Sequence, residues 1–375
     1  MIPILPAQSS STLPMEWVST MLTWYTSHHR PLPWRLTPSP YRTWISEVMS
    51  QQTQLGTVVP YFDRFTQQIP DIPTLAAVDQ NHLLKLWEGL GYYRRAINLQ
   101  TAAQQMMEHW NGALPTTYHD LQSLSGVGPY VAAAIASIAF EQPIPVVDGN
   151  VLRVFTRFWG IELDIRLPKT KQYLFDALLP HIHASGHPSY FNQAMMEIGA
   201  LRCHPQSPQC SMCPLSEDCV AFQQNRTASL PVKSKKSPTP HYTIGVGVIL
   251  HHGHVVIGQR PVTAMLGGLY EFPGGKQWPN EPIESTVIRE INEETGLCVT
   301  LNRHLATIQH AYTHFKITMI AHECAVSPIT PSLPDLAPPF QWVPIETLPQ
   351  YPFPKANLSL LKHLLPPSPP QPVLT

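Results

Sequence analysis

The sequence predicts two domains of different class, an all-α domain followed by an α+β domain. At 375 residues the chain is longer than an ordinary single domain. Apolar residues recur at helical spacing over residues 15–228, whereas from residue 242 apolar and β-branched residues alternate around short turns. The stretch between these regions, SLPVKSKKSPTPH at 229–241, is rich in proline and lysine and is typical of an exposed linker.

Periodicity places the main elements within the two domains. Helices are expected within residues 41–65 and 78–110, where apolar residues return every three or four positions. In the second domain, TIGVGVIL and HVVIGQR flank the turn HHG at 251–253 and predict a hairpin. A further strand is expected at 316–326 and a helix at 287–297. The second domain should end near residue 365, and the proline-rich tail 366–375 is expected to be disordered.

Charge and hydropathy restrict the partners of the chain. Lys and Arg number 24 and Asp and Glu 25, so the chain lacks the overall positive field of many nucleic-acid-binding proteins. Any contact with nucleic acid must therefore come from local patches. The chain lacks an apolar stretch of about eighteen residues, and its N-terminus lacks the charged start and apolar run of a secretory signal. We expect a cytoplasmic protein without a membrane partner.

Four of the six cysteines lie close together in the sequence, at Cys203, Cys210, Cys213 and Cys219. Thiols stay reduced in the cytoplasm, so this group favours metal ligation over disulfides. The spacing C-x6-C-x2-C-x5-C is a single compact loop, which suits a four-iron cluster better than a structural zinc site, although zinc stays an alternative. The other two cysteines, Cys298 and Cys324, are expected to be small buried apolar residues.

The cysteine loop resembles the one that closes the helical domain of the endonuclease III-like DNA glycosylases. LSGVGPYVAAAIASIAF at 124–140 is similar to the helix-hairpin-helix of that superfamily. In this turn, Gly126, Val127 and Gly128 would present bare backbone N–H groups at a helix N-terminus, which can bind a DNA phosphate without a charged side chain. The resemblance implies a [4Fe-4S] cluster at 203–219 and double-stranded DNA as the partner.

The residue that follows this turn distinguishes two chemistries within the superfamily. Relatives that also cleave the DNA strand carry there a lysine whose amine attacks the sugar. Here the position is Tyr130, and no lysine occurs between Lys85 and Lys169. The resemblance therefore implies that water is the nucleophile and that the reaction stops at base removal.

Two further segments resemble the adenine DNA glycosylases of the A/G-mismatch family, the MutY type. These are LPWR at 32–35 and WISEVMSQQTQ at 44–54. The resemblance makes Glu47 a catalytic glutamate and places Trp34 and Arg35 in the adenine pocket. It also implies that Gln52 and Tyr92 enter the DNA stack beside the mispaired base, in a monomeric enzyme that would be nucleoid-associated if bacterial.

The chemistry of base release explains why two carboxyl groups are expected. Adenine leaves more readily when N7 is protonated, which requires an acid that keeps its proton near neutral pH, and burial would raise the pKa of Glu47 in that direction. Asp148, in PVVDGNVLRVFTR at 145–157, matches the essential aspartate of the superfamily. In its ionised form it would stabilise positive charge on the sugar. Tyr130 and Asn150 are expected to orient the water and the carboxylates.

The second domain contains a Nudix box, G-x5-E-x7-R-E-I-x-E-E-x-G-L, from Gly275 to Leu297. On its helix Glu290, Glu293 and Glu294 share one face, which suits magnesium beside a nucleotide diphosphate. In the MutY family the Nudix-like domain reads 8-oxoguanine, and the resemblance assigns that role here to Tyr312, Thr313 and His314. The retained acidic helix leaves open a pyrophosphohydrolase activity.

These observations predict a monofunctional glycosylase that removes adenine mispaired with 8-oxoguanine or guanine in base excision repair. Two rivals stay open from the sequence. One is a hydrolase of free nucleotides whose helical domain only binds DNA, and the other is an iron–sulfur sensor that binds the mismatch without releasing a base.

Overall fold

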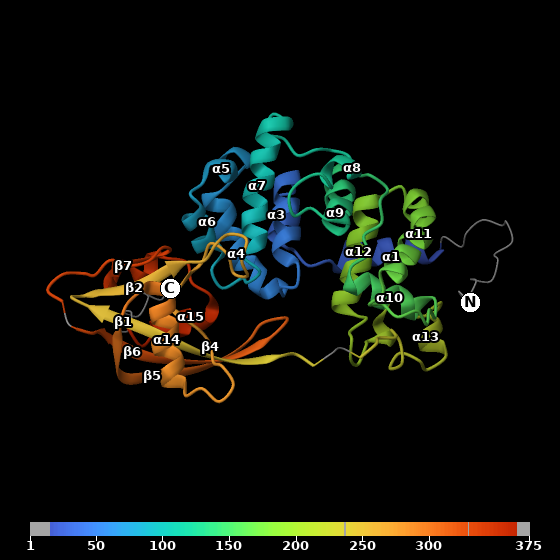
Figure 1. Ribbon diagram of the computed structural model, residues 1–375. Coiled ribbons are helices and arrows are strands. Elements are labelled where there is room, and N and C mark those ends of the chain that lie inside the picture. Colours follow the sequence, from blue (N-terminus) through green and yellow to red (C-terminus); the bar gives the residue numbers. More distant parts are fainter. Residues whose placement is uncertain (1–15, 236–237, 329, 366–375) are drawn as a thin grey trace, which may run out of the picture. The chain divides into compact units, whose positions relative to one another are not determined.

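A computed structural model describes residues 16–235, 238–328 and 330–365 of the chain (Figure 1). The contacts divide the chain into two units. Unit 1 comprises Met1–Ala76 and Leu99–Lys236, and unit 2 comprises Ala77–Asn98 and Ser237–Thr375. The second boundary lies within the expected linker. The segment Ala77–Asn98 groups with the C-terminal part, which the periodicity does not indicate. The tail 366–375, expected to be disordered, lies outside the described residues.

Unit 1 is helical, as the sequence predicts. Its helices are α1 (Glu16–His28), α2 (Pro33–Leu36), α3 (Pro40–Ser50), α4 (Leu55–Gln68), α5 (Ile72–Ala77), most of α7 (Arg94–His109), α8 (Tyr118–Leu121), α9 (Pro129–Phe140), α10 (Gly149–Phe158), α11 (Pro168–Ser185), α12 (Pro188–Leu201) and α13 (Val220–Gln223), with a 3-10 turn, η1 (Cys210–Met212). The expected helical segment 41–65 is interrupted after Ser50, where Gln52 takes a positive φ of 57°. The segment 78–110 is likewise divided between α6 (Gln80–Trp87) and α7.

Local capping fixes where the helices of the site begin. Asp148 is the N-cap of α10 and accepts a hydrogen bond from the backbone N–H of Val151 at 2.7 Å. Ser39 caps α3 in the same way by accepting from the N–H of Arg42. Gly128 precedes α9, which has a proline in its first turn. Tyr130 and Asp148 therefore lie at helix N-termini, whereas Glu47 lies near the C-terminal end of α3.

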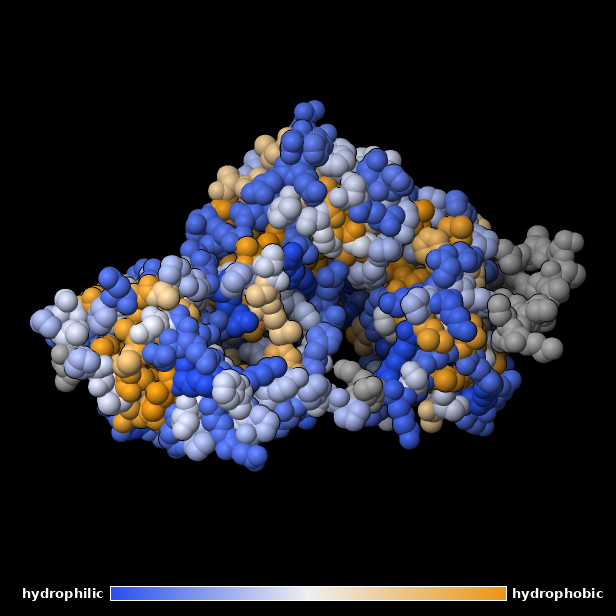
Figure 2. All heavy atoms as spheres, viewed as in Figure 1, coloured by the Kyte–Doolittle hydropathy of each residue, from blue (hydrophilic) through white to orange (hydrophobic). Residues whose placement is uncertain are grey.

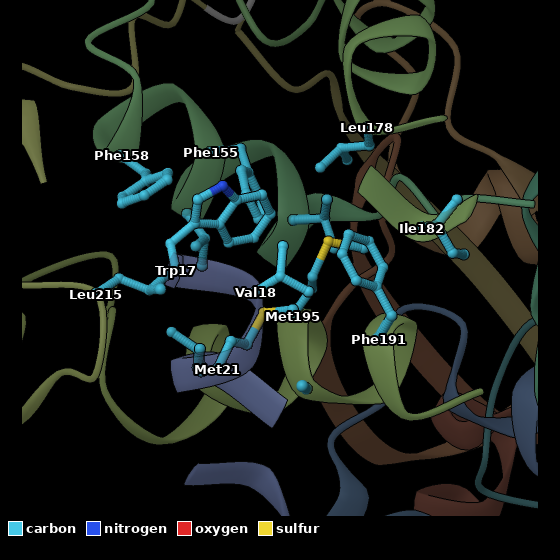
Figure 3. Packing of buried hydrophobic residues seen from close by; sticks show 14 of the residues in the cluster. Trp17, Val18, Met21, Phe155, Phe158, Leu178, Ile182, Phe191, Met195 and Leu215 are labelled. Atoms are coloured by element: carbon cyan, nitrogen blue, oxygen red, sulfur yellow. The ribbon is translucent and has the colours of Figure 1, made fainter. Parts of the chain in front are cut away.

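The largest core of unit 1 packs α1, α10, α11 and α12 against one another (Figure 3). Trp17 and Met21 of α1 meet Phe155 of α10 and Phe191 and Met195 of α12 (Figure 3). Close packing of large apolar side chains resists even small displacements. This core therefore fixes the positions of α10 and α12, which carry residues of the candidate site.

Unit 2 contains a mixed sheet of the strands β1 (His241–His251), β2 (His254–Gln259), β3 (Tyr270–Glu271), β4 (Gly274–Lys276), β5 (Val299–Ala311), β6 (Lys316–Val326) and β7 (Phe340–Pro344). The expected hairpin is confirmed as β1–β2, with His251 opposite His254, and the strand expected at 316–326 is β6. β1 pairs with β6 in parallel, with Thr243 opposite Thr318, and β6 pairs with β5 in antiparallel. The sequence does not predict this mixed order.

Helices cover the sheet of unit 2. α14 (Ile283–Thr295) is the helix expected from the acidic segment, and it packs against β1 and β4 (Figure 1). Val287 and Ile291 of α14 form one core with Ile249 and Val256 of the sheet. α15 (Lys355–Leu361) contacts β5 and contributes to a second core, and a 3-10 segment, η2 (Ile345–Gln350), precedes it. Unit 2 is therefore an α+β unit with two apolar cores.

On the face shown in Figure 2, hydrophobic side chains reach the surface in groups separated by hydrophilic ones. Within the described part of the chain, none of the helices has the length and hydropathy needed to cross a bilayer.

Candidate active site

Three helices of unit 1 bring together the two carboxyl groups expected from the sequence. Glu47 lies on α3, Tyr130 lies in the first turn of α9, and Asp148 caps α10. The Tyr130 hydroxyl donates a hydrogen bond to Glu47 Oε2 at 2.8 Å. The charge of Asp148 acts on both Glu47 and Tyr130, so the three side chains share one polar cluster within an apolar surrounding.

The two carboxyl groups have different surroundings. Burial raises the pKa of Glu47 to about 7, with Asp148 adding to this rise while the Tyr130 hydrogen bond and the positive charge of Arg35 oppose it. Burial also raises the pKa of Asp148, but hydrogen bonds from Val151 N–H and Asn150 favour its ionised form. The Asn150 Nδ2 group donates to Asp148 Oδ2 at 2.8 Å. Glu47 therefore holds its proton more readily than Asp148.

A cavity of about 380 Å³ opens beside Glu47 in unit 1. Glu47 is half-buried because part of its side chain faces this space. Trp34 and Arg35, which were expected to form an adenine pocket, line the same cavity. The other lining residues are Tyr25, Thr26, His29, Pro38, Thr43, Ser46, Ile138, Glu141, Ser189, Tyr190, Gln193 and Met196. Its volume and its mixed apolar and polar walls suit a planar base.

Sequence reasoning missed two polar residues of this region, Gln193 and Glu197 on α12. Gln193 accepts hydrogen bonds from the Tyr25 hydroxyl and from Arg35 Nε, both at 2.9 Å. Glu197 lies one turn further along the helix and is paired with Arg30 and Arg35. The segment NQAMMEIG reads as an ordinary amphipathic helix, so only the two polar residues spaced four apart could have suggested a shared face.

Arg153 on α10 links Asn150 to the cysteine loop. Its Nη2 group donates to Asn150 Oδ1 at 2.9 Å and to the Gly199 carbonyl oxygen at 2.7 Å. Its Nε donates to the Cys203 carbonyl oxygen at 2.6 Å. A continuous chain of hydrogen bonds therefore runs from Asp148 through Asn150 and Arg153 to the first cysteine.

The four cysteines of the loop line one void of about 20 Å³, together with Arg157 and Phe222. Burial raises the pKa of Cys213 to about 12, and the neighbouring thiols add to this rise. Because clustered thiols resist ionisation together, thiolates here need a positively charged partner. Among the described residues, no three His, Cys, Asp or Glu side chains are arranged to hold a single metal ion. The four thiols line one void, and four cysteine sulfurs are a donor set that fits an iron–sulfur cluster.

Comparisons with known proteins identify both domains. Residues 45–178 match the model of the HhH-GPD superfamily base excision DNA repair proteins, and residues 245–363 match that of the NUDIX domain. The adenine DNA glycosylase of Mus musculus is 33% identical, over 82% of this chain and 70% of that protein. That of Buchnera aphidicola subsp. Schizaphis graminum is 38% identical, over 80% of this chain and 85% of its own length.

The chain belongs to the adenine DNA glycosylase family. Among solved structures, a thermostable thymine-DNA glycosylase is 27% identical with a TM-score of 0.49, and the match covers 56% of this chain and 96% of that one.

The turn expected to bind DNA in this family member lies between α8 and α9. Gly126 is exposed with a positive φ of 72°, and a side chain on Gly128 would meet no atom within 4 Å. Val127 is buried and its N–H donates to the Leu124 carbonyl oxygen at 3.1 Å. The two glycines thus remain at the surface while Val127 anchors the turn.

The two residues expected to enter the DNA stack both lie in turns with left-handed backbone. Gln52 is exposed in the turn after α3, in unit 1. Tyr92 has a positive φ of 49° and belongs to unit 2, where its hydroxyl forms a hydrogen bond with the Thr313 hydroxyl. Tyr92 and Thr313, which the sequence assigned to different tasks, therefore contact each other.

The loop expected to recognise 8-oxoguanine connects β5 to β6. The Tyr312 N–H donates to the Phe315 carbonyl oxygen at 2.8 Å, and the two rings stack at 4.8 Å between centroids. Thr313 and His314 are exposed at the tip. Tyr312, Thr313 and His314 line a cavity of about 550 Å³ together with Tyr92 and Arg94 of the same unit.

The acidic residues of the Nudix box lie on α14, but other groups engage them. Arg289 forms ion pairs with Glu281, with Glu290 at 2.9 Å and with Glu293 at 3.1 Å. Glu294 Oε2 accepts a hydrogen bond from the Gly274 N–H at 2.8 Å. Among the described residues, these carboxylates are not arranged to hold a metal ion.

We predict that Arg153→Gln lowers both the stability of unit 1 and the rate of adenine release. The substitution leaves the carbonyl groups of Gly199 and Cys203 without a donor, and each unpaired buried group costs about 1–3 kcal/mol. Circular dichroism melting and single-turnover excision assays measure the two effects. Arg226→Gln is the matched control, since it removes partly exposed interactions, namely the ion pair with Glu162 and a hydrogen bond to Gln224. If the two variants had the same melting temperature and the same rate of adenine release, the role of Arg153 would be contradicted.

Proposed function

We propose that this protein is a monofunctional glycosylase that hydrolyses the N-glycosidic bond of adenine mispaired with 8-oxoguanine or guanine. The observation that carries the proposal is the cluster of Glu47, Tyr130 and Asp148 beside a cavity of about 380 Å³. A buried acid with a pKa near neutrality and a second carboxylate held by donors are the two groups that this hydrolysis needs.

In the proposed mechanism the adenine base occupies the cavity lined by Trp34 and Arg35. Entry requires the nucleotide to leave the duplex, which costs a few kcal/mol of stacking and pairing. Glu47 donates its proton to N7, so the base leaves in a neutral form. The Tyr130 hydroxyl holds the Glu47 carboxyl in place.

Asp148 acts on the sugar as the base leaves. Its ionised form stabilises the positive charge that develops on the ring, and the donors Val151 N–H and Asn150 favour that ionised form. Water then attacks C1′ of the sugar and passes a proton to the Glu47 carboxylate, which restores the acid, while Tyr130 and Asn150 fix the geometry of the carboxylates that orient the water.

Water is the proposed nucleophile because no amine is available in the corresponding place. Tyr130 occupies the position of the lysine in strand-cleaving relatives, and burial raises the pKa of its phenol well above the usual value. A neutral phenol is a poor nucleophile, so base removal should leave the DNA strand intact.

Double-stranded DNA is the proposed partner of a protein acting as a monomer in the cytoplasm, at the nucleoid if the source is bacterial. Gly126 and Gly128 would place backbone N–H groups against a phosphate, and Gln52 and Tyr92 would fill the space left by the extruded base. In unit 2, Tyr312, Thr313 and His314 would contact the 8-oxoguanine that stays in the duplex.

A [4Fe-4S] cluster is the proposed resident cofactor, held by Cys203, Cys210, Cys213 and Cys219. When bound, it would neutralise the four thiolates and fix the loop that follows α12. Arg157 donates to Cys203 Sγ at 3.4 Å and to the His204 carbonyl oxygen at 2.7 Å, which ties the loop to α10. A role in shaping the DNA-binding surface, away from Glu47, is consistent with this position.

A second function is favoured by a cavity in unit 2 that a polar side chain faces, namely binding of a free purine nucleotide. A cavity of about 440 Å³ is lined by apolar residues of the sheet and by Arg260, Glu271, Lys276 and Asn357, and Arg260 forms an ion pair with Glu271. Asn357 is only 8% exposed, yet its side-chain amide forms no hydrogen bond with a described residue. A buried amide facing a cavity suits the edge of a base, and Lys276 and Arg260 suit phosphates. Hydrolysis with magnesium on Glu290, Glu293 and Glu294 would require Arg289 to release them.

The first prediction from this function concerns the general acid. Glu47→Gln should reduce single-turnover adenine release from an A:8-oxoguanine duplex by about 10²-fold or more, because an amide cannot supply the proton. Duplex binding in a gel-shift assay should change little. In the unsubstituted protein the rate should fall as pH rises through about 7, since the active form of Glu47 is protonated. Glu108→Gln, on the exposed face of α7, should leave both measurements unchanged.

The second prediction concerns the nucleophile. Product DNA should remain unnicked until alkali is added, and sodium borohydride should trap no covalent protein–DNA adduct. Denaturing gel electrophoresis separates these species. A borohydride-dependent adduct would show that an amine attacks the sugar and would overturn the hydrolytic mechanism.

The third prediction concerns the nucleotide cavity. Calorimetric titration with 8-oxo-dGTP and dGTP should show binding that Asn357→Ala weakens by about tenfold, the size expected for the loss of one buried hydrogen bond. Asn302→Ala, at an exposed asparagine of β5, is the control. Absence of binding to the unsubstituted protein would exclude this second function and leave the glycosylase proposal intact.

A further inference from the structure

Glu197 is a buried carboxylate with an unusually complete set of cationic partners. Its side chain is 1% exposed. Arg30 donates to it three times, from its backbone N–H and Nε to Oε1 at 2.9 and 2.7 Å and from Nη2 to Oε2 at 2.9 Å. Arg35 Nη2 also donates to Oε2, at 3.1 Å. Burial alone would raise the pKa of Glu197, but these hydrogen bonds lower it to about 2, so the carboxylate stays ionised.

This carboxylate lies behind the wall of the adenine cavity and holds one of its charged residues. Arg35 lines the cavity together with Glu47, and its guanidinium bonds Glu197 on one nitrogen and Gln193 on another. Its third nitrogen donates to the Arg30 carbonyl oxygen at 3.1 Å. Each nitrogen of the guanidinium thus has a fixed acceptor, so Arg35 has little freedom to turn toward Glu47.

The charge of Arg35 acts on the general acid. It lowers the pKa of Glu47, opposing the rise caused by burial. The other ionisable groups that face Glu47 are Tyr130 on α9 and Asp148 at the start of α10. Further titratable groups line the cavity, namely His29, Glu141, Tyr25 and Tyr190. Among the groups whose charge shifts the pKa of Glu47, Arg35 is the cation. The more completely a nearby carboxylate neutralises Arg35, the less Arg35 favours loss of the proton from Glu47.

We propose that Glu197 is a positioning residue of the adenine site, which fixes the Arg35 guanidinium against Gln193 and offsets its positive charge beside Glu47. The proposal rests on the proposed release of adenine and adds a residue that does not line the cavity. Glu197 acts on the reaction through Arg35, and its effect is therefore on the protonation of Glu47 and on the geometry of the cavity wall.

The test is the pH dependence of single-turnover adenine release. Glu197→Gln keeps the shape of the side chain but removes its charge, so Arg35 favours the ionised form of Glu47 more strongly. Ionised Glu47 cannot donate a proton, and the pH at which the rate falls should move down by about one unit. The rate should then drop about tenfold above neutral pH and return toward that of the unsubstituted protein in acid.

Two further variants keep the proposal testable if loss of a buried charge prevents folding. Arg30→Gln removes a cation from the partly exposed side of the cluster, so the negative charge of Glu197 then offsets Arg35 alone. The pH midpoint of adenine release should therefore move up. Glu197→Asp retains the charge and should keep the midpoint of the unsubstituted protein even if the maximal rate is lower. In an Arg35→Gln background, Glu197→Gln should shift the midpoint less than it does alone.

The outcomes separate this inference from the proposed function. If the unsubstituted protein releases adenine and the midpoints of Glu197→Gln and Arg30→Gln coincide with its own, Glu197 has only a structural role and the inference fails. If all variants lose rate equally at every pH, the inference also fails. If the unsubstituted protein releases no adenine from either mismatch, the proposed function itself is wrong.

Discussion

The difference between the two half-buried carboxyl groups, Glu47 and Asp148, is the constraint on which the candidate site depends. Burial raises the pKa of both Glu47 and Asp148 and so disfavours the ionised form of each. Asp148 differs because it caps α10, where a backbone N–H and the Asn150 amide donate to it. The positive end of the helix dipole adds to this effect. Within this cluster of described residues, Glu47 accepts a hydrogen bond from Tyr130 alone, so it holds its proton more readily than Asp148. The division of roles therefore follows from where each carboxyl lies on its helix.

Keeping these groups in register requires rigid helices, and packing in unit 1 supplies the rigidity. α10 and α12 approach each other at Gly199, where a side-chain carbon would lie 2.5 Å from the Asn150 Cβ. Only glycine permits this approach, and it allows the Gly199 carbonyl to reach Arg153. The aromatic core of Trp17, Phe155 and Phe191 holds the other faces of these helices (Figure 3). A displacement of either helix would move Asn150 and thus change its hydrogen bond to Asp148.

The sequence predicts what depends on local pattern and misses what depends on long-range pairing. Helical periodicity, the Nudix box and the cysteine spacing identify both domain classes, and Glu47, Tyr130 and Asp148 follow from short motifs. The parallel pairing of β1 with β6 joins segments about 70 residues apart, and nothing local specifies it. Glu197 was missed for the same reason, because its partners Arg30 and Arg35 are distant in sequence and its own helix looks ordinary. A buried ion pair leaves no periodic signal in either of its segments.

Several arginines of unit 1 bind groups inside the site, which bears on how a chain of near-neutral charge can bind DNA. Arg30 and Arg35 bind Glu197, whereas Arg153 and Arg157 donate to backbone carbonyl oxygens around α10 and the cysteine loop. These cations stabilise the interior of the site and so contribute little to a positive outer surface. Phosphate binding must then rely more on neutral donors, and the exposed glycine turn before α9 offers backbone N–H groups at a helix N-terminus. In such an arrangement the backbone N–H groups of the glycine turn would contribute to DNA binding, while Arg30, Arg35, Arg153 and Arg157 hold the interior of the site.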